Sequence, residues 1–186
     1  MNGIDMKKKV LALIEELNEN SAGMTDDPDI RTKYIHSANQ VMFELARMKK
    51  LARYAEKQVE AGETLTLKDI GQLIGRDVYQ LDQVRGISFD MKANGTVIKI
   101  RSTGLAEIEC FVYPERITEE NESDYEYELS DDVLEIMPYG IAADLLKSDK
   151  SAEYGSVYAS EYERKLNRLD PRNQMGMLII EGGVDL

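Results

Sequence analysis

The sequence predicts an α+β fold that is mainly helical, and three observations carry this prediction. Apolar and small residues repeat about every 3.5 residues from Tyr34 to Val59, the spacing of a long helix that packs lengthwise on another helix. Between residues 84 and 113 the repeat shortens to two around Asn94-Gly95, a strong hairpin signal. Helical spacing returns between residues 130 and 170. We therefore expect a long second helix, an inserted three-stranded antiparallel β-meander and a C-terminal helical pair.

Residues 1–83 are expected to form a helical region. A first helix over residues 4–19 carries one apolar face. The second helix starts at the acidic caps and proline of Thr25-Asp26-Asp27-Pro28 and runs to Gly62, over roughly 45 Å. The seam of this second helix consists of Tyr34, Ala38, Val41, Leu45, Met48, Ala52, Ala55 and Val59.

A third, short helix is expected from Thr66 to Leu73. Thr66 can cap its first turn, Asp69 stands three residues on as in a capping box, and Gly75 can close it. Residues 64–84 also offer an alternative function, because a short helix, a turn with glycine and a second apolar-patterned segment are typical of a helix-turn-helix DNA-binding regulator. That second segment carries two aspartates, however, and carboxylates facing phosphates would oppose DNA binding.

The register of the β-meander follows from its two turns. The Asn94-Gly95 turn places Met91 opposite Ile98 and Phe89 opposite Ile100.

The next loop, Ser102-Thr103-Gly104, sets the third strand. With three loop residues, Ile98 lies opposite Ile108 and Ile100 opposite Ala106; with two, glutamates would lie opposite those isoleucines. Because register follows the apolar face, we expect the three-residue loop.

An acidic segment follows the meander. Residues 119–132 hold eight acidic side chains in fourteen positions, and we expect an exposed loop or an edge strand. Together with the meander it makes up the region 84–129. Acidic residues are typical calcium ligands, but this segment lacks the central glycine that the EF-hand pattern requires. A solvated loop is therefore favoured over a calcium site.

The C-terminal region, residues 130–170, is expected to be a helical hairpin that packs on the N-terminal helices. Ser130-Asp131-Asp132 caps its first helix, which Pro138 should kink or restart. The last helix covers residues 152–169. Residues 171–186 are expected to form an extended arm with an apolar centre.

Residue usage argues against an enzyme. Cys110 is the single cysteine and His36 the single histidine, so a disulfide within the chain, a cysteine-based zinc site and a second imidazole ligand are all excluded. We expect no catalytic, metal-binding or cofactor-binding residues. No apolar run approaches the ~20 residues of a membrane span, and we read no targeting signal, so a soluble, intracellular protein is expected.

The net charge of −12 disfavours sequence-independent binding of nucleic acid. One basic cluster could meet phosphate or an acidic partner, although such a run is more often the solvated face of a helix. The acidic segment of this chain is an available mate for it. The cluster consists of Arg47, Lys49, Lys50, Arg53 and Lys57.

Tyrosines spaced four residues apart on the last helix predict a buried face, which could lie in the core or in a subunit interface. The apolar centre of the arm, which has no helical face of its own, is a second candidate for an interface. The candidate interface residues are Tyr139, Leu146, Tyr154, Tyr158, Tyr162, Met177, Leu178, Ile179 and Ile180.

The C-terminal third resembles the head-to-tail adaptor (connector, or head completion) proteins of tailed bacteriophages and prophages. The resemblance lies in Pro138-Tyr139 followed by Ala142-Ala143, an acidic turn, and the Tyr162-Glu163 pair of the last helix. The order of elements upstream agrees, from helices through a small β element that ends at Val112-Tyr113-Pro114. Gly140 departs from the pattern, since a bulkier residue is expected after the Pro-Tyr pair.

The resemblance implies a structural protein without enzymatic activity. Such proteins dock as a ring of about twelve copies on the portal protein, extend the DNA channel towards tail or stopper proteins, and let DNA pass without specific binding. They assemble in the host cytoplasm and then form part of the virion neck. An anionic channel wall suits this role, because repulsion prevents phosphate contacts.

Overall fold

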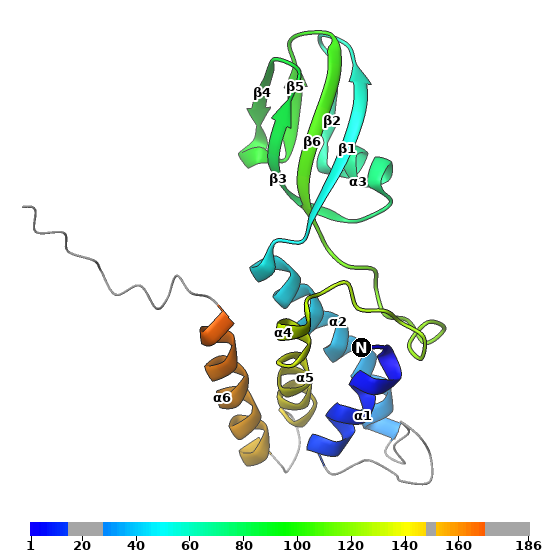
Figure 1. Cartoon of the computed structure of the whole chain (residues 1–186), viewed down its shortest axis with the longest axis vertical. Helices are drawn as coiled ribbons and strands as arrows, with labels where there is room; N and C mark the ends of the chain where they lie inside the picture. The colour runs from blue at the N-terminus through cyan, green and yellow to red at the C-terminus, as the bar shows by residue number, and fades with distance from the viewer. Residues whose placement is uncertain (15–27, 148–151, 170–186) are drawn as a thin grey trace, which may run out of the picture.

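The computed structural model describes residues 1–14, 28–147 and 152–169, which form a helical lobe and a β lobe (Figure 1). Each lobe has its own hydrophobic core. The α+β class is confirmed. The helical lobe contains α1 (Gly3–Leu13), α2 (Pro28–Lys49), α4 (Asp131–Leu134), α5 (Met137–Leu146) and α6 (Ala152–Leu169). The β lobe contains β1 (Ala52–Val59), β2 (Thr64–Thr66), α3 (Leu67–Ile74), β3 (Val78–Arg85), β4 (Phe89–Lys92), the 3-10 turn η1 (Ala93–Gly95), β5 (Val97–Ile100) and β6 (Gly104–Val112).

The long second helix is shorter than predicted, because α2 ends at Lys49 and β1 takes the place of most of its expected last three turns. Lys50 adopts a left-handed conformation, with φ of 53°, that no helix can continue through. β1 then pairs with β6, from Ala52 opposite Phe111 to Val59 opposite Gly104. Pairing with a strand this far along the chain overrides local helix propensity. The predicted boundary of a helical region at residue 83 is therefore wrong.

The predicted hairpin register is confirmed, with Phe89 opposite Ile100 and Met91 opposite Ile98. The predicted place of the third strand is wrong. β6 does not pair with β5 but lies between β1 and β3, whereas β5 lies between β2 and β4. Ile98 and Ile108 thus meet across one core instead of side by side in one sheet.

The chain passes from the first sheet to the second at Gly86, where only glycine fits. Its φ is 80°, and a Cβ atom there would lie 2.3 Å from the carbonyl oxygen of Leu105. The two three-stranded sheets pack around the core of the β lobe, and α3 lies against β1, β2 and β3.

The short helix α3 is confirmed. Thr66 caps it through a full capping box with Asp69, and Gly75 ends it in a left-handed conformation, with φ of 70°. The segment after it is strand β3. The second helix that a helix-turn-helix over residues 64–84 would require is therefore absent from this described segment.

A loop of residues 114–130 returns the chain from the β lobe to the helical lobe, and we call it the acidic strap. It holds seven Asp or Glu residues against one arginine, a net charge of −6, which is half of the net charge of −12. Of the two forms predicted for this segment, the structure has the loop. Its β pairing with the rest of the described residues is one bridge between Asn2 and Glu126. Pro138 restarts the helix, as predicted, because α4 ends at Leu134 and α5 begins with this proline in its first turn.

Candidate functional site

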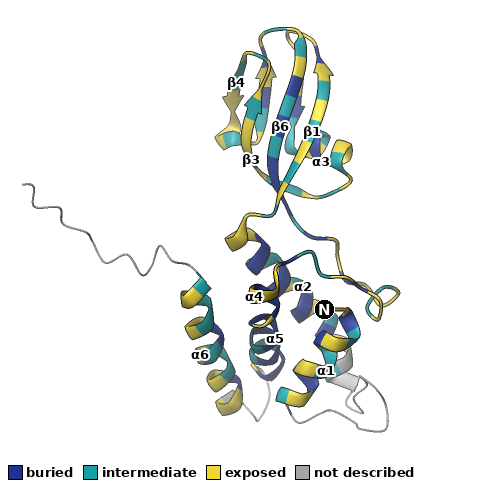
Figure 2. Ribbon diagram, in the orientation of Figure 1, coloured by how far each residue is buried: buried dark blue, intermediate teal, exposed yellow. Residues whose placement is uncertain are grey.

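The predicted tyrosine stripe on α6 divides along its length. Tyr162 is 9% exposed and belongs to the core of the helical lobe, and burial raises its pKa above the ordinary value. Tyr158 is half-buried and donates a hydrogen bond to the carbonyl oxygen of Leu13 at the end of α1. Tyr154 is 67% exposed, as is Val157 at 62%. The N-terminal end of α6 therefore presents two large hydrophobic residues to solvent, and Figure 2 shows exposed positions along this helix.

Two further candidates lie on α5. Leu146 is 8% exposed, and its backbone and Cβ lie close to Gly155 of α6. Tyr139 is half-buried, and the ammonium of Lys165 lies 4.8 Å from its ring centroid. Both residues thus contribute mainly to packing between α5 and α6. The remaining candidates, Met177, Leu178, Ile179 and Ile180, lie outside the described residues, as does the predicted arm.

Residues of both lobes meet in an aromatic junction. Tyr113 lies next to Phe43 of α2 and Tyr79 of β3, with ring centroids 4.9 Å apart in each pair. The guanidinium of Arg47 lies 5.4 Å from the Tyr113 centroid and 5.6 Å from that of Tyr79. Each cation–π contact of this kind contributes about 0.5–2 kcal/mol. Burial at the junction also raises the pKa of the Tyr79 hydroxyl. The junction ties the end of α2 to the β lobe.

Two of the five residues of the basic cluster pair with the acidic segment of the same chain. Lys49 lies 3.0 Å from Asp132, and Arg53 pairs with Glu128. Glu128 also accepts from Arg76 of the β lobe, at 2.8 Å. One carboxylate of the strap therefore holds two arginines of the other lobe. The proposed mate of the cluster is confirmed at Lys49 and Arg53.

The acidic strap is fixed along its length to the helical lobe. The side-chain amide of Asn39 on α2 donates to the carbonyl oxygen of Ile117 at 2.8 Å and accepts from its N–H at 2.9 Å. Lys7 of α1 lies 2.8 Å from Glu122. Tyr125 is buried in the core, and its hydroxyl donates to a carbonyl oxygen of the strap. These contacts hold the backbone in place.

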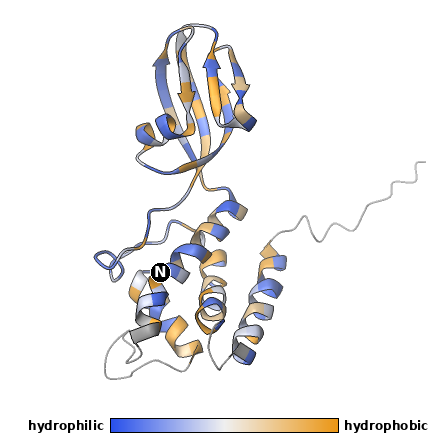
Figure 3. Cartoon of the chain, turned by 180° about the vertical axis from the view of Figure 1, so that it is seen from behind, coloured by the Kyte–Doolittle hydropathy of each residue, from blue (hydrophilic) through white to orange (hydrophobic). Residues whose placement is uncertain are grey.

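The remaining carboxylates of the strap point to solvent, and this segment is strongly hydrophilic in Figure 3. No signal in the sequence pattern predicted how the strap is anchored. The exposed acids of the strap are Glu115, Glu119, Glu120, Asp124 and Glu126.

The single cysteine and histidine do not form a site. Cys110 is buried in the core of the β lobe, and burial raises the pKa of its thiol to about 11. His36 lies exposed on α2. Among residues 1–14, 28–147 and 152–169 there is no group of three or more potential metal ligands, and no helix there is long and apolar enough to cross a membrane.

No protein-family model matches this chain, and no curated protein matches it. The candidate site consequently rests on geometry alone. It combines the exposed end of α6 with an anionic strap that is anchored at both lobes.

Proposed function

We propose that this chain is a structural adaptor of the head-to-tail junction of a tailed bacteriophage or prophage, docking as a ring on the portal and extending the DNA channel towards the tail. The observation that carries the proposal is the acidic strap. Seven carboxylates lie on a backbone held by α1 and α2, five of them exposed. A fixed anionic surface of this kind repels duplex DNA and so lets it slide without sticking.

The outer end of α6 supports a second part of the proposal, contact with other subunits. Tyr154 and Val157 are large apolar side chains at more than half exposure on one helix. Tyrosine is enriched at protein interfaces because it offers both an apolar ring and a hydrogen-bonding hydroxyl. A ring needs such a face on every copy, since each contact in it joins two different surfaces.

The direct test uses the purified chain mixed with a portal protein from the same phage or prophage. We expect native mass spectrometry and negative-stain electron microscopy to show a ring on the portal, about twelve copies by the family resemblance. Absence of any complex with the portal would overturn the adaptor proposal. Tight, sequence-dependent retention of duplex DNA in an electrophoretic shift at physiological salt would overturn it as well and favour a regulator.

A truncation tests the role of the C-terminal segment. Deleting residues 173–186 is expected to leave the thermal unfolding of the chain unchanged and to weaken docking on the portal. The full chain serves as the control in the same docking assay. Normal docking by the truncated chain would show that this segment is no arm.

A further inference from the structure

The two sheets of the β lobe share one core, so their outer faces point away from each other. Ile98 of β5 and Ile108 of β6 are both fully buried in that core. Because side chains alternate along a strand, the neighbours of these residues face outward. The two outer faces carry opposite charge.

The outer face of the β1-β6-β3 sheet is acidic. Glu56 and Glu109 extend from β1 and β6, and Glu107 lies opposite both Glu56 and Arg85. Arg85 lies on the same face, and it donates to Gln83 at 2.5 Å. In the described part of the chain no cation lies within ion-pair distance of the three carboxylates. We call these four charged residues, with a net charge of −2, the acidic face.

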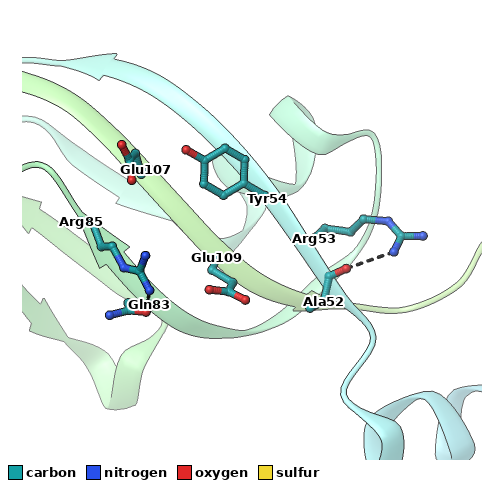
Figure 4. A pocket seen from close by; sticks show the side chains of 7 residues that line it. All are labelled: Ala52, Arg53, Tyr54, Gln83, Arg85, Glu107 and Glu109. Atoms are coloured by element: carbon teal, nitrogen blue, oxygen red, sulfur yellow. Dashed lines mark hydrogen bonds between the residues drawn. The ribbon is translucent and has the colours of Figure 1, made fainter.

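The acidic face is not arranged for the stability of the lone chain. Glu56 and Glu107 are directly cross-strand neighbours, and like charges in that position destabilise a sheet. Tyr54, which is 56% exposed, donates to Glu56 at 2.8 Å, and this bond together with the nearby carboxylates raises the pKa of Tyr54 to about 12. A shallow recess of about 260 Å³ lies beside the ring (Figure 4). Cations brought by a partner would relieve the repulsion.

The outer face of the β2-β5-β4 sheet is basic. Asp90 lies opposite Lys99 and 2.5 Å from Arg101, and Lys92 stands two residues along the same strand. Arg101 above all, and then both lysines, lower the pKa of Asp90, in keeping with the ion pair and the cross-strand position of Lys99. Neither lysine lies within ion-pair distance of a carboxylate among the described residues. We call these residues, with a net charge of +2, the basic face.

We propose that the β lobe is a head-to-tail self-association module, in which the acidic face of one copy docks on the basic face of a second copy of this chain. The charges are equal and opposite, and the two faces lie on opposite sides of one small lobe. When two copies dock in this way, one copy keeps a free basic face and the other a free acidic face. Further copies can therefore add until a ring closes or a filament forms. The inference rests on the proposed function in that it supplies one contact of the proposed ring.

Charge reversal of each face tests the contact. E107K/E109K makes both faces basic, and K92E/K99E makes both faces acidic. Sedimentation velocity of the full chain across a concentration series is expected to show association that weakens from 0.05 to about 1 M salt, where the screening length falls to about 3 Å. Each variant alone should associate at least about tenfold more weakly than the wild type, because like charges then face each other.

An equal mixture of the two variants is the decisive measurement. Acidic faces of one variant then meet basic faces of the other, so association should return to within about threefold of the wild type. This recovery also shows that both variants fold. A wild-type chain that stays monomeric throughout, or a mixture that behaves as two non-associating variants, would overturn the module.

The two proposals fail separately. If both variants form rings on the portal as the wild type does, the adaptor function stands and the β lobes do not make the contact. If the wild type ignores the portal but the charge-reversed mixture associates, the module stands and the adaptor function fails.

Discussion

Gly140 of α5 lies directly beneath the ring of Tyr162 of α6. A Cβ atom at position 140 would lie 2.8 Å from Cε2 of Tyr162 and 2.9 Å from Cγ1 of Val41 on α2. The three helices therefore approach one another at a point where no side chain fits. This explains why glycine stands where the family resemblance predicted a bulkier residue. It also fixes Tyr162 in the core, whereas Tyr154 and Val157 at the N-terminal end of α6 stay exposed.

Gly140→Ala should lower the free energy of unfolding by up to about 2 kcal/mol. Overpacking of about 1–3 kcal/mol outweighs the ~1 kcal/mol by which alanine favours a helix over glycine. Chemical denaturation measures the change. Gly155→Ala is the matched control, because its added Cβ would meet Leu146 at 3.3 Å and the loss should be smaller. A Gly140→Ala chain as stable as the wild type would contradict this packing.

Glu128→Gln should lower the free energy of unfolding by about 1–2 kcal/mol, because one carboxylate serves both Arg53 and Arg76 at a partly buried position. The loss should shrink in 1 M salt, where ion pairs contribute less. Thermal unfolding at two salt concentrations measures it. The control is Glu126→Gln on the exposed side of the strap, which should stay within about 0.5 kcal/mol of the wild type. Equal losses in both variants would show that Glu128 does not join the lobes.

The hairpin could be predicted from the sequence because its determinants are local. The Asn94-Gly95 turn and the apolar alternation on either side fixed Phe89 opposite Ile100 without any other part of the chain. The capping box of α3 and the restart at Pro138 are local in the same sense. Each signal lies within a few residues of the element that it sets.

The errors arise where the deciding contact is distant. Residues 52–59 have a pattern that suits a helix seam, and only pairing with β6 makes them a strand. For β6, alternation identified Ala106 and Ile108 as core residues but did not reveal which strand lies beside them. A core-facing side chain is buried equally well whichever strand lies beside its own, so the alternation does not identify the neighbouring strand.

The candidate site shows the same division. The α6 spacing predicted a buried face, yet a face that is buried at Tyr162 and exposed at Tyr154 depends on where α5 ends and on Gly140. The strap was predicted to be solvated, and its carboxylates largely are. The strap is anchored by Asn39, a side chain about eighty residues away in the sequence, so no local sequence pattern predicts this contact.

Thr66→Ala should lower the stability of the chain by about 1 kcal/mol, because the hydroxyl caps α3 and its loss leaves an N–H without a partner. Thr66→Ser keeps the hydroxyl and should restore the wild-type stability. Hydrogen bonds from Thr66 hold the pKa of Asp69 below its ordinary value. The contribution of the ionised Asp69 carboxylate to stability is therefore fully present above the ordinary pKa of an aspartate, and it is lost as pH falls through the lowered pKa. Denaturation of the three chains at neutral and acid pH measures both effects, and a Ser variant as unstable as the Ala variant would refute the cap.

Cys110 should react with a thiol reagent at neutral pH only when the β lobe opens. The side chain is fully buried, and burial, with Glu109 adding to it, raises the thiol pKa from 9.0 to about 11. The thiol contribution to stability is present below pH 9 and lost as pH rises towards 11, because the folded state disfavours the thiolate. Labelling rates across a urea series should follow unfolding. Labelling in buffer as fast as in strong denaturant would place Cys110 at the surface.

Reversing the charge of the acidic strap should make the assembled ring hold DNA. Glu119, Glu120, Asp124 and Glu126 are exposed, so changing all four to lysine leaves the fold intact and moves the net charge from −12 to −4. If the strap lines the proposed channel, the lysines meet phosphates and slow the passage of duplex DNA through the ring on its portal. The effect should weaken steeply with salt, because it depends on counterion release.

The control for this reversal changes four exposed acids that lie away from the strap. These are Glu60, Asp77, Asp82 and Glu163, and their change to lysine gives the same net charge of −4. Retention of labelled duplex DNA by ring–portal particles, measured from 0.05 to 0.3 M salt, separates the two variants. The strap variant should retain DNA and the control should release it as the wild type does. Equal retention by both variants would mean that net charge alone governs DNA contact. It would contradict the proposal that the strap lines the channel.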